Sequence, residues 1–136
     1  MSPNASKPST GPRKLKVLCI DDDPEITKAI KLRLEPHGVE VVRAFDGMQG
    51  YWTALDTRPD VIICDMIMPD GEGNYLFARF RSHSLTKDVP IIILTGAANP
   101  ALKRQMLSVG VDAYLAKPLV FDELLSELRR LAPLST

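Results

Sequence analysis

The sequence is short of cysteine, of net charge and of long apolar runs, and each shortage argues against a class of protein. Only two of its 136 residues are cysteines, Cys19 and Cys64, and both lie within short apolar runs. They are expected to be buried thiols in a reducing compartment rather than a disulfide. The formal net charge is +0, so the bulk charge does not favour direct contact with nucleic acid. No apolar run approaches membrane-spanning length and no signal peptide opens the chain, so we expect a cytoplasmic protein without membrane contact.

The composition is that of one ordinary globular domain with short polar ends. Of the residues, 45% are hydrophobic and 25% are charged. Residues 1–13 are rich in Ser, Pro and Gly and are predicted to be a disordered tail. Residues 14–132 are predicted to form the domain, with 133–136 as a C-terminal tail. The chain ends soon after its last predicted helix, which fits either a stand-alone module or a piece of a longer protein.

From Lys14 onward, strand-like apolar runs alternate with helix-like segments. Strands are predicted over 15–20, 39–44, 60–64, 90–94 and 113–116. Helices are predicted between Asp23 and Gly38, over 47–55, over 73–81, from Asn99 to Val109 and over 120–131. Alternation with short connections predicts an α/β fold with a single parallel sheet that is doubly wound, with helices on both faces.

Details of these segments give further expectations. The second strand carries Glu40 and Arg43, so it is predicted to be an edge strand, which makes 2-1-3-4-5 the natural strand order. Trp52 is predicted to pack against the fold rather than to contact a ligand. Leu102, Met106 and Val109 are predicted to lie on one side of the fourth helix.

Polar functional groups follow four of the apolar strands. Asp21 and Asp22 follow the first strand and Asp65 follows the third. Thr95 follows the fourth strand and Lys117 follows the fifth. Because the carboxyl ends of parallel strands lie at one edge of a sheet, these side chains are expected to converge. An acid cluster, a hydroxyl and a lysine together predict a metal-assisted phosphoryl site.

The acids explain the metal and the nucleophile of such a site. Carboxylates at two central strand ends repel one another, and we expect Asp22 to take part in a buried like-charge contact. Mg²⁺, for which Mn²⁺ can substitute, removes that cost when Asp21, Asp22 and Asp65 supply its oxygen ligands. An ionised carboxylate can attack phosphorus to form an aspartyl phosphate. Thr95 and Lys117 can then bind the phosphoryl oxygens.

Other polar residues have simpler interpretations. Asp23 precedes Pro24 and is predicted to cap the first helix. His37 and His83 lie at helix ends and are expected to be solvated rather than catalytic. The sequence has no glycine-rich nucleotide-binding loop.

Taken together, these residues resemble the receiver domain of response regulators from two-component signalling systems. The resemblance covers about residues 14–132, and its functional positions follow one another in the expected order. They are the acidic pair Asp21-Asp22, the phosphoacceptor Asp65 followed by Met68-Pro69 and Gly73, the hydroxyl residue Thr95, the switch aromatic Tyr114, and Lys117-Pro118. Because every acceptor residue is present, nothing favours a receiver that binds partners without phosphorylation.

The resemblance implies a flavodoxin-like fold and a phosphotransfer reaction. A histidine kinase or a histidine phosphotransfer protein would offer a phosphohistidine, and Asp65 would be the modified residue. The carbonyl group of Ile67 would be a further metal ligand, and Lys117–Pro118 would be a cis peptide bond. The protein would catalyse its own phosphorylation and dephosphorylation and would not be a turnover enzyme on external substrates.

The resemblance also implies how the signal leaves the site. Thr95 would move toward the phosphoryl group, and Tyr114 would rotate inward into the space that it vacates. This change would alter the surface formed by the fourth helix, the strand 113–116 and the helix 120–131. A downstream protein or an output domain would bind there, without direct contact of this domain with nucleic acid.

A phosphatase of the haloacid dehalogenase type is the alternative. Asp21 and Asp23 form the required Asp-x-Asp after a strand, and Thr95 and Lys117 follow in that family's order. That family needs a further acidic pair at a later strand end, whereas Asp122-Glu123 opens a predicted helix. The alternative also leaves Asp65 without a role.

Overall fold

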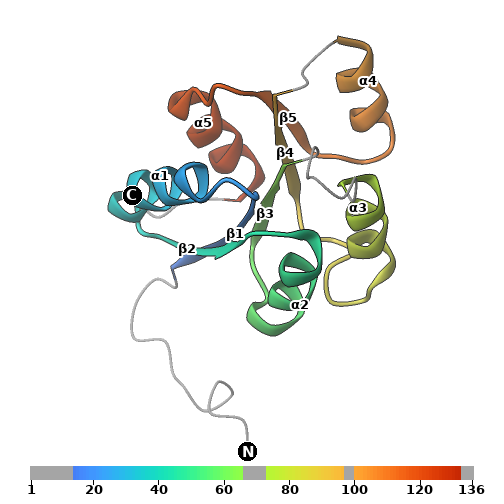
Figure 1. Ribbon diagram of the computed structural model, residues 1–136, viewed down its shortest axis with the longest axis horizontal. Helices are drawn as coiled ribbons and strands as arrows, with labels where there is room; N and C mark the ends of the chain where they lie inside the picture. The colour runs from blue at the N-terminus through green and yellow to red at the C-terminus, as the bar shows by residue number, and fades with distance from the viewer. Residues whose placement is uncertain (1–13, 66–72, 97–99, 133–136) are drawn as a thin grey trace, which may run out of the picture.

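A parallel β-sheet forms the centre of the molecule, and helices cover both of its faces (Figure 1). The computed structural model describes residues 14–65, 73–96 and 100–132. Its strands are β1 (Leu15–Ile20), β2 (Val39–Ala44), β3 (Val61–Cys64), β4 (Ile91–Thr95) and β5 (Ala113–Ala116). Its helices are α1 (Pro24–Leu34), the 3₁₀ turn η1 (Glu35–His37), α2 (Gly47–Thr57), α3 (Gly73–Ser82), α4 (Pro100–Ser108) and α5 (Phe121–Leu131). The predicted tails at 1–13 and 133–136 lie outside the described residues, and so does Ile67.

The strand order is β2-β1-β3-β4-β5 with every pair parallel, as predicted. Ile20 at the end of β1 pairs with Cys64 at the end of β3. Thr95 at the end of β4 pairs with Ala116 at the end of β5. The strands therefore stop nearly level, and whatever follows them is held at one edge of the sheet.

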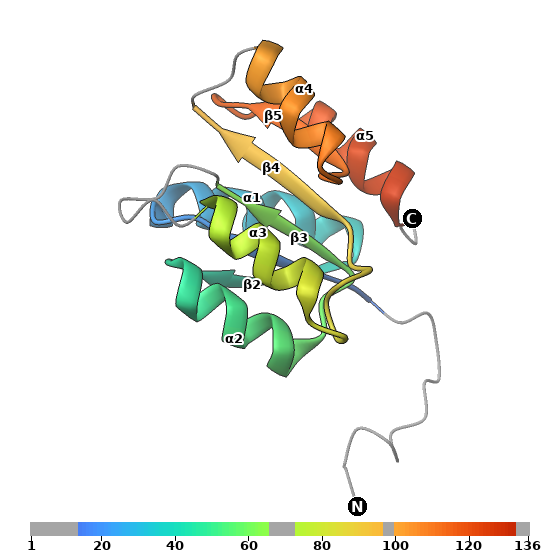
Figure 2. The same ribbon diagram turned by 90° about the vertical axis from the view of Figure 1, so that its right-hand side faces the viewer.

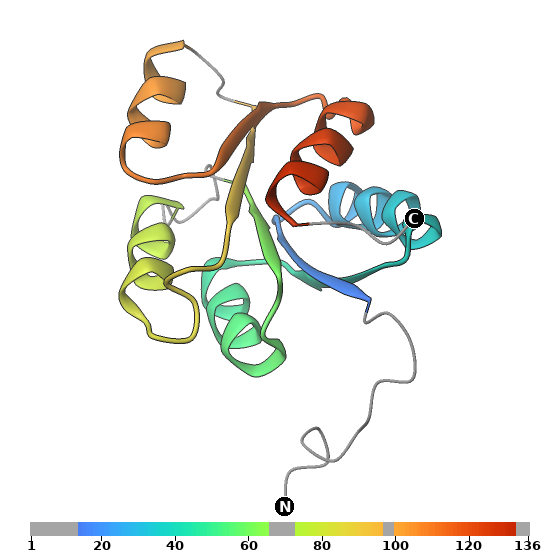
Figure 3. The same ribbon diagram turned by 180° about the vertical axis from the view of Figure 1, so that it is seen from behind.

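The two faces of the sheet have separate apolar cores. Helices α1 and α5 cover one face, and α2, α3 and α4 cover the other, which Figure 3 shows from behind. Alternate residues of each strand supply the two cores: Val17 and Cys19 face α1 and α5, whereas Leu18 and Ile20 face the other side. Because both faces are covered, β1, β3 and β4 are continuous apolar runs, as parallel strands require.

Helix α1 begins where the sequence predicts, but the α-helix itself ends before Gly38, the predicted end. The Asp23 carboxylate accepts a hydrogen bond from the Glu25 backbone N–H at 2.9 Å, and Pro24 occupies the first turn. The α-helix ends at Leu34 and tightens into η1. Gly38 then closes the segment with a φ of 76°, a left-handed conformation that glycine adopts without strain.

Two apolar residues are more exposed than the sequence suggested. Trp52 is 59% exposed, because α2 turns a stripe of small residues and Tyr51 toward the sheet and Trp52 lies just outside that stripe. Val109 is 55% exposed, because α4 ends at Ser108 and the chain turns at Gly110, where φ is 104°. Val111 supplies the buried side chain after this turn instead.

Gly50 brings the backbone of α2 close to the sheet. A Cβ atom at this position would lie 2.5 Å from Cδ1 and 2.8 Å from Cγ1 of Ile20, a side chain that is fully buried. We therefore expect Gly50→Ala to lower the free energy of unfolding by roughly 1–3 kcal/mol through overpacking. Urea denaturation measures the change, and Gly96→Ala is the control, because no described atom lies within 4 Å of its added Cβ. Equal unfolding midpoints for both variants would contradict the close contact.

Candidate functional site

Three strand ends hold two acids and a lysine at the carboxyl edge of the sheet. Asp21 directly follows β1, Asp65 directly follows β3, and Lys117 directly follows β5. The backbone N–H groups of all three donate to carbonyl oxygens of neighbouring strands, at 3.0, 2.9 and 2.9 Å respectively. The backbone hydrogen bonds of the sheet therefore continue one residue beyond each strand. They fix the backbone positions from which the three side chains extend.

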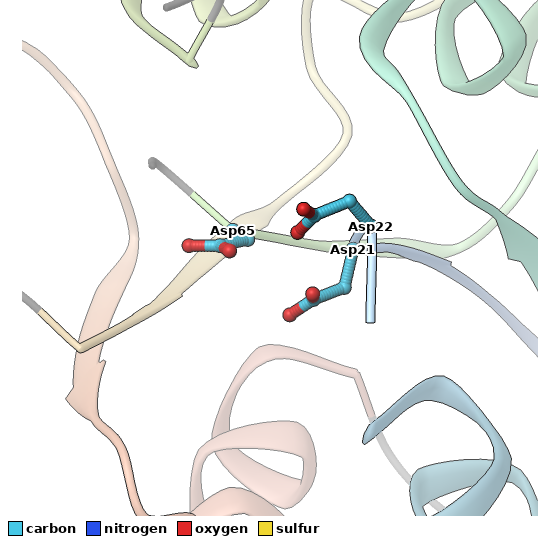
Figure 4. Close-up of side chains that lie close together, drawn as sticks. All are labelled: Asp21, Asp22 and Asp65. Carbon is cyan, nitrogen blue, oxygen red and sulfur yellow. The ribbon is translucent and has the colours of Figure 1, made fainter. Parts of the chain in front are cut away.

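The structure places Asp21, Asp22 and Asp65 around one point (Figure 4). One carboxylate oxygen from each residue lies within 4.8 Å of the other two. Asp21 is 2% exposed and Asp65 is 4% exposed, whereas Asp22 is exposed to solvent. Three oxygen donors, one of them open to water, fit a hard divalent cation such as Mg²⁺, which keeps several water ligands.

The buried like-charge contact involves a different residue from the one predicted. We expected Asp22 in it, but Asp22 lies in the turn beyond β1 and is exposed, whereas Asp21 is buried. Burial raises the pKa of Asp21 above its ordinary value of 3.8, and the charge of Asp65 adds to this effect. Hydrogen bonds from Lys117 and from the Asp23 backbone N–H lower it in part. Because the folded-state pKa is raised, this group destabilises the fold as the pH rises above 3.8 through that pKa.

Lys117 supplies the positive charge of the site. Its Nζ atom lies 2.9 Å from Oδ2 of Asp21 and 3.2 Å from Oδ2 of Asp65, and its side chain is 21% exposed. Burial alone would lower the pKa of Lys117, but its hydrogen bonds and ion pairs with the two acids outweigh burial and raise it above 10.5. Lys117 therefore follows β5 as a cation and forms ion pairs with Asp21 at the end of β1 and Asp65 at the end of β3. The Lys117–Pro118 peptide bond is cis, as the resemblance implied.

Thr95 and Tyr114 lie on the same face of neighbouring strands. Tyr114 pairs with Ile93, and Thr95 is two residues beyond Ile93 on β4, so both side chains lie toward α4. Thr95 is fully buried, and Tyr114 is 5% exposed. Both side chains are therefore buried in this structure, and the inward rotation of Tyr114 stays a prediction.

Arg43 lies near the site, and the sequence did not indicate a role for it. Arg43 on β2 donates from its guanidinium to the Thr27 hydroxyl at 3.0 Å and to the Pro24 carbonyl at 3.1 Å. These bonds fix the first turn of α1 directly after the acidic turn. The sequence shows Arg43 only as a charge on an edge strand, and no motif links it to residues that lie 16 and 19 positions earlier.

The fold and the site together define a phosphoacceptor signalling module. The family model described as "Response regulator receiver domain" matches residues 17–129. The chain therefore belongs to the response regulator receiver domain family of two-component systems. This assignment gives no support to the phosphatase alternative.

Curated relatives from several bacteria agree with this family. The chain is 35% identical over 116 residues to the DNA-binding dual master transcriptional regulator RpaA of Synechocystis, covering 85% of this chain and 48% of RpaA. It is 33% identical over 119 residues to protein PilG of Pseudomonas aeruginosa, covering 88% of both. The chain thus spans about half the length of the transcriptional regulators that it matches.

Solved structures share the fold. The chemotaxis response regulator CheY4 of Vibrio cholerae has a TM-score of 0.79 and 35% identity, covering 87% of this chain and 98% of CheY4. The receiver domain of the sensor histidine kinase PA1611 of P. aeruginosa has a TM-score of 0.77 and 30% identity, covering 87% and 97% of the two chains. That structure has a magnesium ion coordinated in its active site cleft. Within the described part of the present chain, no helix has the length and apolar character needed to cross a bilayer.

Proposed function

We propose that Asp65 is the phosphoacceptor of this receiver domain. Its position supports the proposal: it is buried beside Lys117 and within 4.8 Å of two other carboxylates. An Asp65 carboxylate oxygen attacks the phosphorus of a phosphohistidine, the P–N bond breaks, and its electron pair stays on the imidazole. Lys117, which already contacts Asp65, can follow the charge onto the phosphoryl oxygens.

We propose Mg²⁺ as the cofactor, with Mn²⁺ as a substitute. The donor set of Asp21, Asp22 and Asp65 supports this, and so does the magnesium in the PA1611 receiver domain. When bound, the ion offsets negative charge on the phosphoryl oxygens. The predicted Ile67 carbonyl ligand lies outside the described residues and remains part of the proposal.

The reaction determines the partners that we propose. Response regulators pair with histidine kinases, and here a histidine kinase or a histidine phosphotransfer protein donates the phosphoryl group. The domain catalyses its own phosphorylation and dephosphorylation and does not turn over external substrates. A cytoplasmic location is part of the proposal and is supported by the two buried free cysteines, Cys19 and Cys64.

The proposed output surface is formed by α4, β5 and α5. A pocket of about 570 Å³ lies between these elements, and Tyr114 contributes to its wall together with Lys103 and Glu123. A movement of Thr95 that repositions Tyr114 would therefore change the shape of this pocket. We propose that a downstream protein or an output domain binds here, without direct nucleic-acid contact by this domain.

Phosphorylation itself is tested by intact-mass measurement after incubation with acetyl phosphate and Mg²⁺. A gain of one phosphoryl group that requires the metal supports the proposed function. An unchanged mass, or continuous hydrolysis of an added phosphomonoester, would contradict it.

The metal cage predicts the effect of Asp22→Ala. Removing the exposed ligand is expected to weaken Mg²⁺ binding by at least about tenfold, because even partners outside the ligand set commonly contribute this much. Asp23→Asn is the matched control, since it removes one neighbouring charge but keeps a capping side chain. Isothermal titration with Mg²⁺ measures both variants. Equal weakening in the two would mean that general acidity, and not this cage, holds the ion.

The switch proposal predicts the effect of Thr95→Ala. The phosphoryl group can shift the conformational equilibrium only through contacts that differ between the two states, and the Thr95 hydroxyl is one of them. Loading with beryllofluoride, a mimic of the aspartyl phosphate, should change amide exchange across 100–130 at least about fivefold less than in the wild type. Thr95→Ser keeps the hydroxyl group and should respond fully. A full response by Thr95→Ala would show that Thr95 does not transmit the phosphorylation signal to residues 100–130.

A further inference from the structure

Helices α2 and α3 carry an exposed cluster of large side chains that the phosphoryl site does not use. We call Met48, Trp52, Tyr75 and Arg79 the α2–α3 patch. Met48 is 65% exposed, Trp52 is 59% exposed and Tyr75 is 61% exposed. Figure 2 shows α2 and α3 side by side on the same face of the sheet. A small pocket of about 150 Å³ lies between them, with Met48, Tyr75 and Arg79 among its lining residues.

The hydrophobic core does not depend on the side chains of the α2–α3 patch. Tyr51 and Ala54 already supply the buried side of α2, and Leu76 and Phe80 supply that of α3. An exposed cluster of large apolar groups commonly marks an interaction site. Tryptophan, tyrosine, methionine and arginine are also the residue types enriched at protein interfaces.

The buried ring of Tyr51 contacts two residues of the α2–α3 patch, Trp52 and Arg79. The Trp52 ring meets Tyr51 edge-on at a centroid distance of 5.4 Å. The Arg79 guanidinium lies 3.8 Å from the Tyr51 centroid and 5.6 Å from that of Tyr75. Side chains already held by such contacts lose little conformational entropy when a partner docks.

Arg79 indicates the charge of the partner. Across residues 14–65, 73–96 and 100–132, no carboxylate forms an ion pair with it. A guanidinium lying over a ring keeps its N–H donors along its edge, where a carboxylate can accept two of them at once. The patch therefore combines apolar anchors with one cation that complements an acid.

We propose that the α2–α3 patch docks an amphipathic helix of a partner protein that places an acidic residue between apolar ones. Two adjacent helices with a shallow pocket between them offer the groove that such a helix fills with anchors on one face. Its acid pairs with Arg79, and its apolar residues cover Met48, Trp52 and Tyr75. The α2–α3 patch shares no residue with the α4–β5–α5 pocket, so this is a separate interface.

The test is a selection from a phage-displayed library of amphipathic helical peptides on the whole chain. Binders are counter-selected against the Trp52→Ala/Tyr75→Ala variant, whose fold is checked by thermal unfolding. The surviving peptides are expected to carry Asp or Glu between apolar residues. A synthesised survivor should bind Arg79→Gln at least about tenfold more weakly than the wild type by isothermal titration. The Glu→Gln peptide should show the same loss, and the two losses should not add.

Matched variants and a second readout make the proposal falsifiable. Arg104→Gln on α4 and Leu32→Ala on α1 change an exposed cation and an exposed apolar residue elsewhere, and both should bind the peptide like the wild type. The fluorescence of Trp52, the only tryptophan of the chain, should shift on binding. Survivors without an acid, or no survivors at all, would overturn the proposal. Self-association that Trp52→Ala abolishes in sedimentation equilibrium would overturn it in favour of a second copy of the chain.

Discussion

Replacing Asp65 with asparagine is expected to abolish phosphoryl labelling by acetyl phosphate in the presence of Mg²⁺. The amide is nearly isosteric with the carboxylate, so the fold should persist, but its oxygen is not a nucleophile. The loss should be complete rather than partial, because Asp21, the other described carboxylate that is buried and paired with Lys117, is proposed to bind the metal and not to attack phosphorus. Intact mass after incubation measures the labelling, and thermal unfolding verifies the fold.

Asp21→Asn is the matched control, because it makes the same chemical change on the neighbouring strand. This variant keeps Asp65 but loses a proposed metal ligand. It should therefore still be labelled, more slowly and with a higher Mg²⁺ requirement. Labelling that persists in Asp65→Asn and disappears only in Asp21→Asn would reverse the assignment of nucleophile and ligand.

Replacing Lys117 with methionine is expected to destabilise the metal-free protein by about 2–3 kcal/mol at neutral pH. Removing one partner of a buried ion pair leaves uncompensated charge, and the partial exposure of this lysine reduces the usual cost. Methionine keeps most of the aliphatic stem, so the effect reports the charge rather than the packing. Urea denaturation in the presence of a chelator measures it.

The pH dependence distinguishes this effect from lost packing. At low pH the Asp21 carboxyl is protonated and needs no cation, so wild type and variant should differ little. The difference should grow as the pH rises above 3.8 through the raised pKa of Asp21, and it should fade only above 10.5, as Lys117 itself deprotonates.

Two further comparisons complete the test. Mg²⁺ should restore part of the stability of Lys117→Met, because it replaces the missing positive charge. Lys31→Met removes an exposed ion pair with Glu35 and a hydrogen bond to the Val41 carbonyl, and it should change stability by only about 1 kcal/mol. A pH-independent loss in Lys117→Met, or an equal loss in Lys31→Met, would show that charge at position 117 is not what stabilises the site.

The fold was predictable because buried parallel strands leave a plain signal. Continuous apolar runs marked β1, β3 and β4, and all five strands were predicted to within one residue of their observed bounds. The charges of Glu40 and Arg43 identified β2 as an edge strand, and the strand order followed from that. The place of Asp21, Asp65 and Lys117 then needed no further information, because parallel strands must end at a common edge.

The features that escaped prediction depend on where side chains lie in three dimensions. Asp21 and Asp22 are adjacent acids in the sequence, and only the end of the ladder decides that the first is buried and the second is exposed. Trp52 is apolar, but it lies beside the buried stripe of α2 rather than in it. Arg43 reaches α1 through a contact between residues 16 positions apart, which no local pattern records.

The close contact between Gly50 and Ile20 should restrict which residues are tolerated at these two positions, which lie far apart in the sequence. Ile20 directly precedes Asp21, the first residue of the acidic turn. An added Cβ at position 50 would lie 2.5 Å from Cδ1 and 2.8 Å from Cγ1 of Ile20, so a larger residue has room there only if position 20 carries a side chain without both of these atoms. Related sequences should therefore vary these two positions as a pair, with glycine opposite isoleucine and alanine opposite a shorter side chain. Substitutions at position 50 of α2 would in this way be limited by the need to keep Asp21 in place at the end of β1.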